Sequence, residues 1–229
     1  MTRNRSPRPI VIGVLGGIAS GKSRVARMLE ARGALRLDAD VFAHAALADP
    51  AVVAALEARH GTALLVPGSM PSERRVDRQF LANRVFGPDA DPTDRRHLEA
   101  LVHPRVREAL GRSLDRALAD HSHPAVVLDV PLLLEATGFV DRCDLLWFVD
   151  APLSQREERA LHTRGWPATE LARRELHQTP LADKRLRADL VLLNDRDEPY
   201  LEAQVAEWLD HAGGFAGLPR KSGAPGAPR

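Results

Sequence analysis

The segment that most constrains this 229-residue chain is a glycine-rich stretch, Gly-Gly-Ile-Ala-Ser-Gly-Lys-Ser at residues 16–23. It fits the pattern G-x-x-x-x-G-K-[ST], whose backbone N–H groups surround the phosphates of a nucleotide. The apolar run Ile10–Leu15 predicts a buried strand before the loop, and residues 23–32 predict a helix after it. Because a helix N-terminus adds the positive end of its dipole, this strand–loop–helix unit predicts binding of a nucleoside triphosphate.

Composition favours one soluble domain, since 229 residues with 44% hydrophobic content can bury one substantial core. The formal net charge is +1, but residues 1–8 and 219–229 hold basic charges only, so the body between them is net acidic. An acidic body argues against a nucleic-acid partner. Cys143 is the single cysteine, which excludes an internal disulfide. No apolar run approaches the roughly 18 residues of a membrane span, so we expect a cytoplasmic protein without a membrane partner.

Further apolar runs predict a parallel sheet covered by helices on both faces, which is an α/β fold of about five strands. Ligands of such sheets bind beyond the carboxyl ends of the strands. These runs occupy residues 34–38, 125–130, 145–150 and 190–194. Helical patterns occupy residues 50–59, 75–86, 105–119, 154–164 and 167–177.

The spacing of the runs predicts the domain organisation. About eighty residues separate the second strand from the third, too many for a simple crossover. We therefore predict a helical insertion that binds the second substrate. The predicted single domain covers residues 9–212, with its core at 9–44, 124–150 and 186–212 and the insertion at 45–123. Residues 1–8 and the Gly-, Pro- and Ala-rich residues 213–229 are predicted to be disordered.

Two residues of the loop carry expected chemistry of their own. Lys22 would contact the β- and γ-phosphates, and the Ser23 hydroxyl would be a ligand of Mg²⁺. Mg²⁺ usually needs a carboxylate as well, often through water. Asp129 ends the most apolar run of the chain and is the expected carboxylate. The alternative is that Asp129 only caps the following turn.

Asp38 and Asp40 lie at the end of the second predicted strand. If the strand continues that far, its period of two puts both carboxylates on one side. A carboxylate beside the γ-phosphate suits a base that orients an attacking hydroxyl and accepts its proton. Both residues could instead be loop-capping acids.

Cations that close on a transferring phosphoryl group could come from Arg156, Arg159 or Arg164. Arg156 and Arg159 share a helix face at i, i+3. Because Glu157 and Glu158 lie between them, a solvated, salt-bridged helix is the alternative.

Landmarks over residues 10–194, about four-fifths of the chain, resemble the dephospho-CoA kinase family. The loop is shared with many families, whereas the later landmarks are more specific. These landmarks are the loop at 16–23, Asp38-Ala39-Asp40 with His44, His103-Pro104, Asp129-Val130-Pro131-Leu132-Leu133 with Glu135, Val149-Asp150, Arg159, Gln178, Ala188-Asp189 and Asn194.

The resemblance implies a P-loop NTPase three-layer sandwich that transfers the γ-phosphate of ATP to the ribose 3′-hydroxyl of dephospho-CoA, as a monomer or weak oligomer. It implies a base at Asp38, a helical lid over residues 151–185 that contains Arg159, and an acceptor site in the insertion. ATP is expected to contact Gly17, Ile18, Ala19, Ser20, Gly21, Lys22, Ser23, Arg24 and Asn194, and the acceptor Asp38, Asp40, His44, His103 and Arg105.

The sequence departs from the family pattern at a few positions. Ala19 replaces a frequent Gly at what we take to be a free position of the loop, and Arg24 replaces a common Thr. Thr163 stands where a second lid arginine is frequent, with Arg164 next to it. Which lid arginine closes on the phosphates therefore stays open.

Other functions remain open. A kinase of a nucleoside monophosphate would share the sheet and loop and differ in the insertion. A GTP-dependent switch is disfavoured, because Asp195 replaces the Lys of N-K-x-D and no Gly follows Asp129 at the spacing of D-x-x-G. A regulatory protein without catalysis is disfavoured by intact Lys22, Ser23 and Asp38.

Overall fold

The computed structural model describes residues 8–66, 74–87, 90–135 and 138–220 and divides the chain into two compact units. We call them the core unit, which comprises the chain up to Asp38 and from Leu114 onward, and the helical unit, Ala39–Ser113. The helical unit overlaps the insertion predicted at 45–123 without sharing its bounds. The reason is that a helix follows Asp38 without a break and a long helix runs from one unit into the other.

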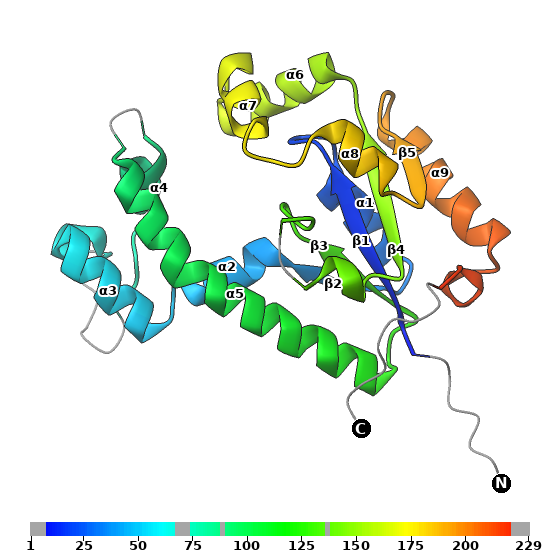
Figure 1. Ribbon diagram of the computed structural model, residues 1–229, viewed down its shortest axis with the longest axis horizontal. Coiled ribbons are helices and arrows are strands. Elements are labelled where there is room, and N and C mark those ends of the chain that lie inside the picture. Colours follow the sequence, from blue (N-terminus) through cyan, green and yellow to red (C-terminus); the bar gives the residue numbers. More distant parts are fainter. Residues whose placement is uncertain (1–7, 67–73, 88–89, 136–137, 221–229) are drawn as a thin grey trace, which may run out of the picture. The chain divides into compact units, whose positions relative to one another are not determined.

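The core unit contains a five-stranded sheet in the order β2-β3-β1-β4-β5, with every pair parallel (Figure 1). The predicted α/β fold with about five parallel strands is confirmed. Because all strands run the same way, their carboxyl ends meet at one edge of the sheet. The strands are β1 (Ile10–Gly16), β2 (Leu35–Asp38), β3 (Ala125–Asp129), β4 (Leu145–Asp150) and β5 (Leu190–Leu193).

Helices α1 (Lys22–Glu30) and α9 (Glu198–His211) pack on one face of this sheet. They bury an apolar stripe against alternate residues of the strands, as the period of two requires. Val25 and Leu29 of α1 are fully buried, and each buried side chain of this size contributes about 1.5–3 kcal/mol. On the opposite face Gly13 leaves room for Leu133 and Cys143, whose side chains a Cβ at Gly13 would meet at 2.5 and 2.8 Å.

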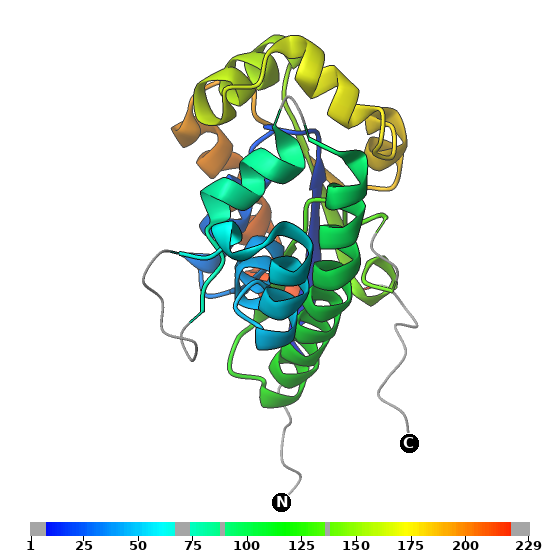
Figure 2. The same cartoon turned by 90° about the vertical axis from the view of Figure 1, so that its left-hand side faces the viewer.

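Helices α6 (Leu153–Arg164), α7 (Ala168–Glu175) and α8 (Leu181–Leu186) lie at the end of the sheet where β1 finishes, as both ribbon views show (Figures 1 and 2). They occupy the predicted lid segment, residues 151–185, and α8 extends to Leu186. Side chains of α6 and α7 pack on the loop after β1, because Ala160 and Leu171 form one apolar cluster with Ile18.

The described residues of the helical unit contain a short 3-10 helix, Thr62–Leu64, and four α-helices: α2 (Ala39–Ala46), α3 (Pro50–His60), α4 (Arg78–Phe86) and most of α5 (Pro92–Asp120). Its own small core includes Val52, Leu56 and Leu81. Helix α5 begins thirteen residues before the predicted start at Arg105 and continues through Pro104, which has no N–H to donate to the preceding turn. The Arg105 guanidinium donates to the carbonyl of Leu101 at 2.9 Å and stabilises this turn.

No single helix of the described chain is long and apolar enough to cross a bilayer. Only α2 and α3 together reach the required length and composition, and they are bent by 69°.

The prediction of two disordered end segments was wrong for Arg8 and for residues 213–220, which the structure describes. Residues 215–217 form a short 3-10 helix after α9, because Phe215 and Leu218 are buried in the sheet core. Arg8 is fixed by the buried carboxylate of Asp144, to which it donates at 2.6 and 2.8 Å. The rest of these segments, residues 1–7 and 221–229, lies outside the described residues.

A buried histidine of the helical unit predicts a pH-dependent stability. The His60 side chain is 2% exposed, with Nδ1 4.0 Å from Asp94 Oδ2. Burial lowers its pKa, as do Arg59, Arg84 and His97, while Asp94 acts in the opposite direction. Below the ordinary histidine pKa of about 6.5 the unfolded chain takes up a proton that the folded chain resists. The free energy of unfolding should therefore fall as the pH falls below that value.

Denaturant titrations at pH values between 8 and 5 measure this dependence. His60→Gln should flatten the acid limb by no more than about 1.4 kcal/mol per pH unit, the slope of one proton. His211→Gln, which changes a surface histidine that contacts the Glu207 carbonyl at 2.9 Å, is the control and should keep the wild-type slope. Equal slopes for the His60 variant and the wild type would contradict this prediction.

Candidate active site

The loop between β1 and α1 has the backbone of a phosphate-binding loop. Gly16 and Gly21 have φ of 152° and 101°, which side chains rarely adopt. A Cβ on Gly16 would lie 2.7 Å from the Val149 carbonyl oxygen, and one on Gly21 2.3 Å from Asn194 Nδ2. Both glycines are thus required by close packing as well as by φ.

Ala19 also has a positive φ, 57°. The interpretation of this position as free was therefore wrong, because an L-residue in this conformation costs about 1–2 kcal/mol relative to glycine. Ala19→Gly removes that strain but increases the conformational entropy of the unfolded chain, which opposes part of the gain in stability. We expect the variant to raise the free energy of unfolding by about 0.5–1 kcal/mol.

A thermal melt measures the effect, which amounts to about 2 °C for a chain of this size. Ala203→Gly, at an exposed position of α9, is the matched control and should lower the melting temperature. A lower melting temperature for Ala19→Gly would show that the strain is absent.

Asn194 supports the loop from the end of β5. Its side chain is buried, and Nδ2 donates to the Ser20 carbonyl at 2.7 Å. Its own N–H donates to the Asp150 carbonyl at 2.7 Å. This residue was predicted to contact ATP, and its described contacts hold the backbone of the loop.

Lys22 closes the loop onto itself. Its Nζ donates to the carbonyls of Gly17 at 2.7 Å and Gly16 at 3.3 Å. Burial lowers the pKa of the Lys22 ammonium to about 8, with Lys184 adding to the effect. The ammonium is still mostly protonated at neutral pH and can exchange the carbonyls for phosphate oxygens.

Ser23, Asp129 and Asp38 come together at the carboxyl edge of the sheet. The Ser23 hydroxyl donates to Asp129 Oδ1 at 3.1 Å. Asp38 and Asp129 are direct partners in the register of β2 and β3, so their side chains emerge side by side. The predicted base and the predicted metal-binding carboxylate therefore occupy adjacent positions.

Arg36, which sequence reasoning missed, bridges these two carboxylates. Its Nη2 lies 2.6 Å from Asp129 Oδ2 and 2.5 Å from Asp38 Oδ2. Partial burial opposes the charge of this guanidinium, but the hydrogen bond and charge of Asp129 raise its pKa overall. The period of two in β2 puts Arg36 and Asp38 on one face and could have revealed the pair.

The residues present fit a magnesium ion that is completed by a nucleotide. A hydroxyl and a carboxylate oxygen are hard donors of the kind Mg²⁺ prefers, and Mg²⁺ usually adds waters and substrate phosphates. The described residues contain no cluster of three or more His, Cys, Asp or Glu that could hold a metal by themselves.

The lid segment reaches the loop through Arg156 and Glu175. Glu175 Oε1 accepts from the backbone N–H of Ile18 at 3.1 Å and from Arg156 Nη1 at 2.5 Å. Arg156 is buried beside Gly17, since a Cβ there would meet its Nη1 at 2.9 Å. A carboxylate of α7 thus accepts one backbone amide of the loop.

Arg159 lies beside Asn194 instead. Its Nη2 donates to Gln155 Oε1 at 2.8 Å and to the Asn194 carbonyl at 3.2 Å. Its Nη1 is buried without a hydrogen-bond partner in the described structure. Burial, followed by the charge of Arg24, lowers the pKa of the Arg159 guanidinium.

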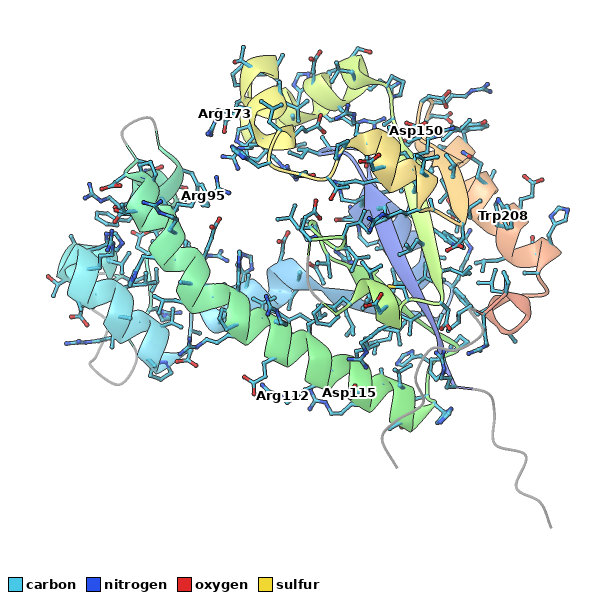
Figure 3. All side chains as sticks on the ribbon, viewed as in Figure 1. Arg95, Arg112, Asp115, Asp150, Arg173 and Trp208 are labelled. Atoms are coloured by element: carbon cyan, nitrogen blue, oxygen red, sulfur yellow. The ribbon has the colours of Figure 1, made fainter. Side chains whose placement is uncertain are left out.

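Several of the sequence landmarks meet around Lys184 of α8. Lys184 is 2% exposed and donates to Gln178 Oε1 at 2.8 Å. Glu135 Oε1 accepts from the Thr179 N–H at 2.7 Å, and its charge acts against the burial that lowers the pKa of Lys184. Asp150, which is labelled in Figure 3, lies at the end of β4 and forms an ion pair with Arg185 of α8.

The predicted acceptor residues Asp40, His44, His103 and Arg105 belong to the helical unit, whereas Asp38 belongs to the core unit. Because β2 ends at Asp38 and α2 begins at Ala39, Asp40 is a helical residue and strand alternation does not relate it to Asp38. His44 and His103 are exposed. Arg105 Nε donates to Asp49 Oδ2 at 3.2 Å.

A phosphate-binding loop with its lysine, a Ser–Asp pair and a neighbouring carboxylate on a parallel sheet define a P-loop phosphotransferase. The sequence profile of the dephospho-CoA kinase family matches residues 10–199. The chain is 36% identical over 205 residues to the dephospho-CoA kinase of Rhodopirellula baltica, which covers 89% of this chain and 91% of the relative. This chain therefore belongs to the dephospho-CoA kinase family.

Other comparisons agree with this assignment. The dephospho-CoA kinase of Parasynechococcus marenigrum is 42% identical over 183 residues, which are 80% of this chain and 86% of the relative. A crystal structure from Thermus thermophilus superposes with a TM-score of 0.64 at 37% identity, covering 89% of this chain and 98% of that one. The dephospho-CoA kinase of Campylobacter jejuni, at 19% identity and a TM-score of 0.61, shares the fold over 88% of this chain and 96% of its own.

Proposed function

We propose that this protein transfers the γ-phosphate of ATP to the ribose 3′-hydroxyl of dephospho-CoA and so forms coenzyme A. The observation that carries the proposal is the register of Asp38 with Asp129 at the edge of the sheet next to the loop. The position of Asp38 next to the Ser23–Asp129 pair supports its assignment as the base. The identity of the acceptor is inferred from membership of the dephospho-CoA kinase family.

In the proposed step the 3′-oxygen forms a bond to the γ-phosphorus while the bond from that phosphorus to the bridging oxygen breaks and ADP leaves. Asp38 accepts the hydroxyl proton. Lys22 and the amides of residues 17–24 bind the phosphates, and Ser23 and Asp129 would hold Mg²⁺, which neutralises charge on them. Since the protein does little covalent chemistry in such a transfer, positioning and charge dominate the rate.

The acceptor site is proposed to lie in the helical unit, with Asp40, His44, His103 and Arg105 as its contacts. Exposed His44 and His103 are accessible to a ligand. Arg105 pairs through Nε with Asp49 and through Nη1 with the Leu101 carbonyl, and guanidinium groups suit the phosphates of such an acceptor.

The acceptor assay tests the proposed function directly. Release of ADP is measured with dephospho-CoA, AMP, CMP and adenosine as separate acceptors. Turnover confined to dephospho-CoA is expected. A preference for AMP or CMP would instead assign a nucleoside monophosphate kinase, and ATP binding without any turnover would favour a regulatory role.

Arg159 is proposed as the lid cation that stabilises the transferring phosphoryl group. Its buried Nη1 has no hydrogen-bond partner in the described structure and can donate to a phosphate oxygen. Arg159→Met should lower kcat by about a hundredfold. Arg156→Met is the matched comparison. It should affect kcat less and lower the melting temperature more, because it strands the half-buried Glu175 carboxylate. A larger loss of kcat in Arg156→Met would assign the role to Arg156.

We further propose a cytoplasmic enzyme that acts as a monomer or weak oligomer on small molecules. The net acidic body of the chain supports small molecules rather than nucleic acid as its partners, because nucleic-acid binding needs clustered basic side chains.

A further inference from the structure

Arg36 occupies the space between the two carboxylates on which the proposed chemistry depends. Its side chain is 17% exposed, against 20% for Asp38 and 5% for Asp129. It comes from β2 itself, so the paired strand fixes the position from which its side chain reaches the two carboxylates. The ion pairs of Arg36 with Asp38 and Asp129 are therefore mostly shielded from solvent, unlike ion pairs on the protein surface.

Both oxygens of Asp129 are engaged in the structure. Oδ1 accepts from the Ser23 hydroxyl, and Oδ2 accepts from Arg36 Nε at 3.1 Å and Nη2 at 2.6 Å. A divalent cation at Ser23 would have to share this carboxylate with a guanidinium. Two cations on one carboxylate repel each other strongly at low solvent exposure. Anionic phosphates at the same place would offset this repulsion.

We propose that Arg36 is a positioning residue that serves as the counter-cation of Asp38 and Asp129 in the free enzyme, so that a divalent metal binds there only together with the phosphates of the nucleotide. This inference rests on the proposed metal role of Ser23 and Asp129. It adds a condition to that role, namely that the phosphates of the nucleotide must offset the charge of Arg36 for the metal to be held. It also gives two adjacent carboxylates a shared hydrogen-bond donor.

Mn²⁺, followed by electron paramagnetic resonance without nucleotide, tests the proposal. The wild type should bind Mn²⁺ weakly at this site. Arg36→Met, which removes the charge but keeps an unbranched side chain, should bind it at least about tenfold more tightly. Asp129→Asn in the Arg36→Met background should abolish the gain, and Arg36→Lys should behave as the wild type.

Stability without nucleotide gives a second readout. In EDTA, Arg36→Met should melt below the wild type, because Asp38 and Asp129 then lose the guanidinium that bridges them. Mg²⁺ should raise its melting temperature more than that of the wild type. Arg112→Met, which removes an arginine from an exposed ion pair with Glu108 on α5 (Figure 3), is the control and should give no Mg²⁺ response beyond the wild type.

Equal Mn²⁺ affinity of Arg36→Met and the wild type would overturn the proposal, as would a gain that persists in the Asp129→Asn background. If Arg36→Met does not fold, Arg36→Met with Asp38→Asn removes the repulsion and gives the same comparison of Mn²⁺ affinity. Metal binding is measured without an acceptor. A failed acceptor assay would therefore reject dephospho-CoA while leaving the Mn²⁺ result to decide on Arg36.

Discussion

Asp38→Asn should lower kcat by about 10²–10⁴-fold, the range that general-base catalysis contributes. The asparagine has the same shape, and Arg36 keeps its contacts with Asp129, so the site should retain its structure. The dissociation constant of ATP should change less than about twofold, because Asp38 acts on the acceptor hydroxyl. Equilibrium ATP binding and initial rates with dephospho-CoA measure the two quantities.

Asp115→Asn is the control for this variant. It neutralises a carboxylate that also pairs with an arginine, Arg142, but lies 68% exposed on α5 (Figure 3). Its kcat should equal that of the wild type. If Asp38→Asn weakens ATP binding as much as it slows turnover, Asp38 maintains the structure of the nucleotide site and is not the base.

Lys22→Met should lower kcat by about 10²–10³-fold, since it removes a cation from the phosphates that carry developing charge. Unlike Asp38→Asn, it should also weaken ATP binding. Both quantities come from the same rate and binding measurements. Unchanged turnover would remove the kinase assignment.

The melting temperature of Lys22→Met separates lost chemistry from lost structure. Burial and the charge of Lys184 lower the Lys22 pKa to about 8, so the charged side chain is disfavoured in the folded protein. Removing this charge should therefore leave the melting temperature unchanged or raise it. Charged active-site residues often lower the stability of the folded protein. A large drop in melting temperature would show that the contacts of Lys22 with Gly16 and Gly17 dominate.

The core of the fold was predictable because its signals are local. Buried parallel strands are continuous apolar runs, and the loop pattern requires Gly16 and Gly21 at positive φ. These signals place Lys22, Ser23, Asp38 and Asp129 on the correct elements. The register that brings Asp38 beside Asp129 follows from strand order, which one sequence does not reveal.

Residues that depend on tertiary contacts were harder to predict. Arg36 in a short strand and Glu175 in a charged helix have the pattern of surface residues, yet one bridges two carboxylates and the other accepts an N–H of the loop. Phe215 lies in a Gly- and Ala-rich segment typical of disorder, and it is ordered by burial in the core. The sequence did not predict that α5 continues through Pro104, because a proline usually ends a helix.

The proposed reaction transfers phosphate to the ribose 3′-hydroxyl of dephospho-CoA. The most direct measurement is phosphorus NMR of the product formed from ATP and dephospho-CoA, with Asp38→Asn as the inactive control. We predict one new phosphomonoester on the 3′-oxygen and an equal amount of ADP. A phosphate at another position, or ADP formed without a phosphorylated product, would contradict this proposal.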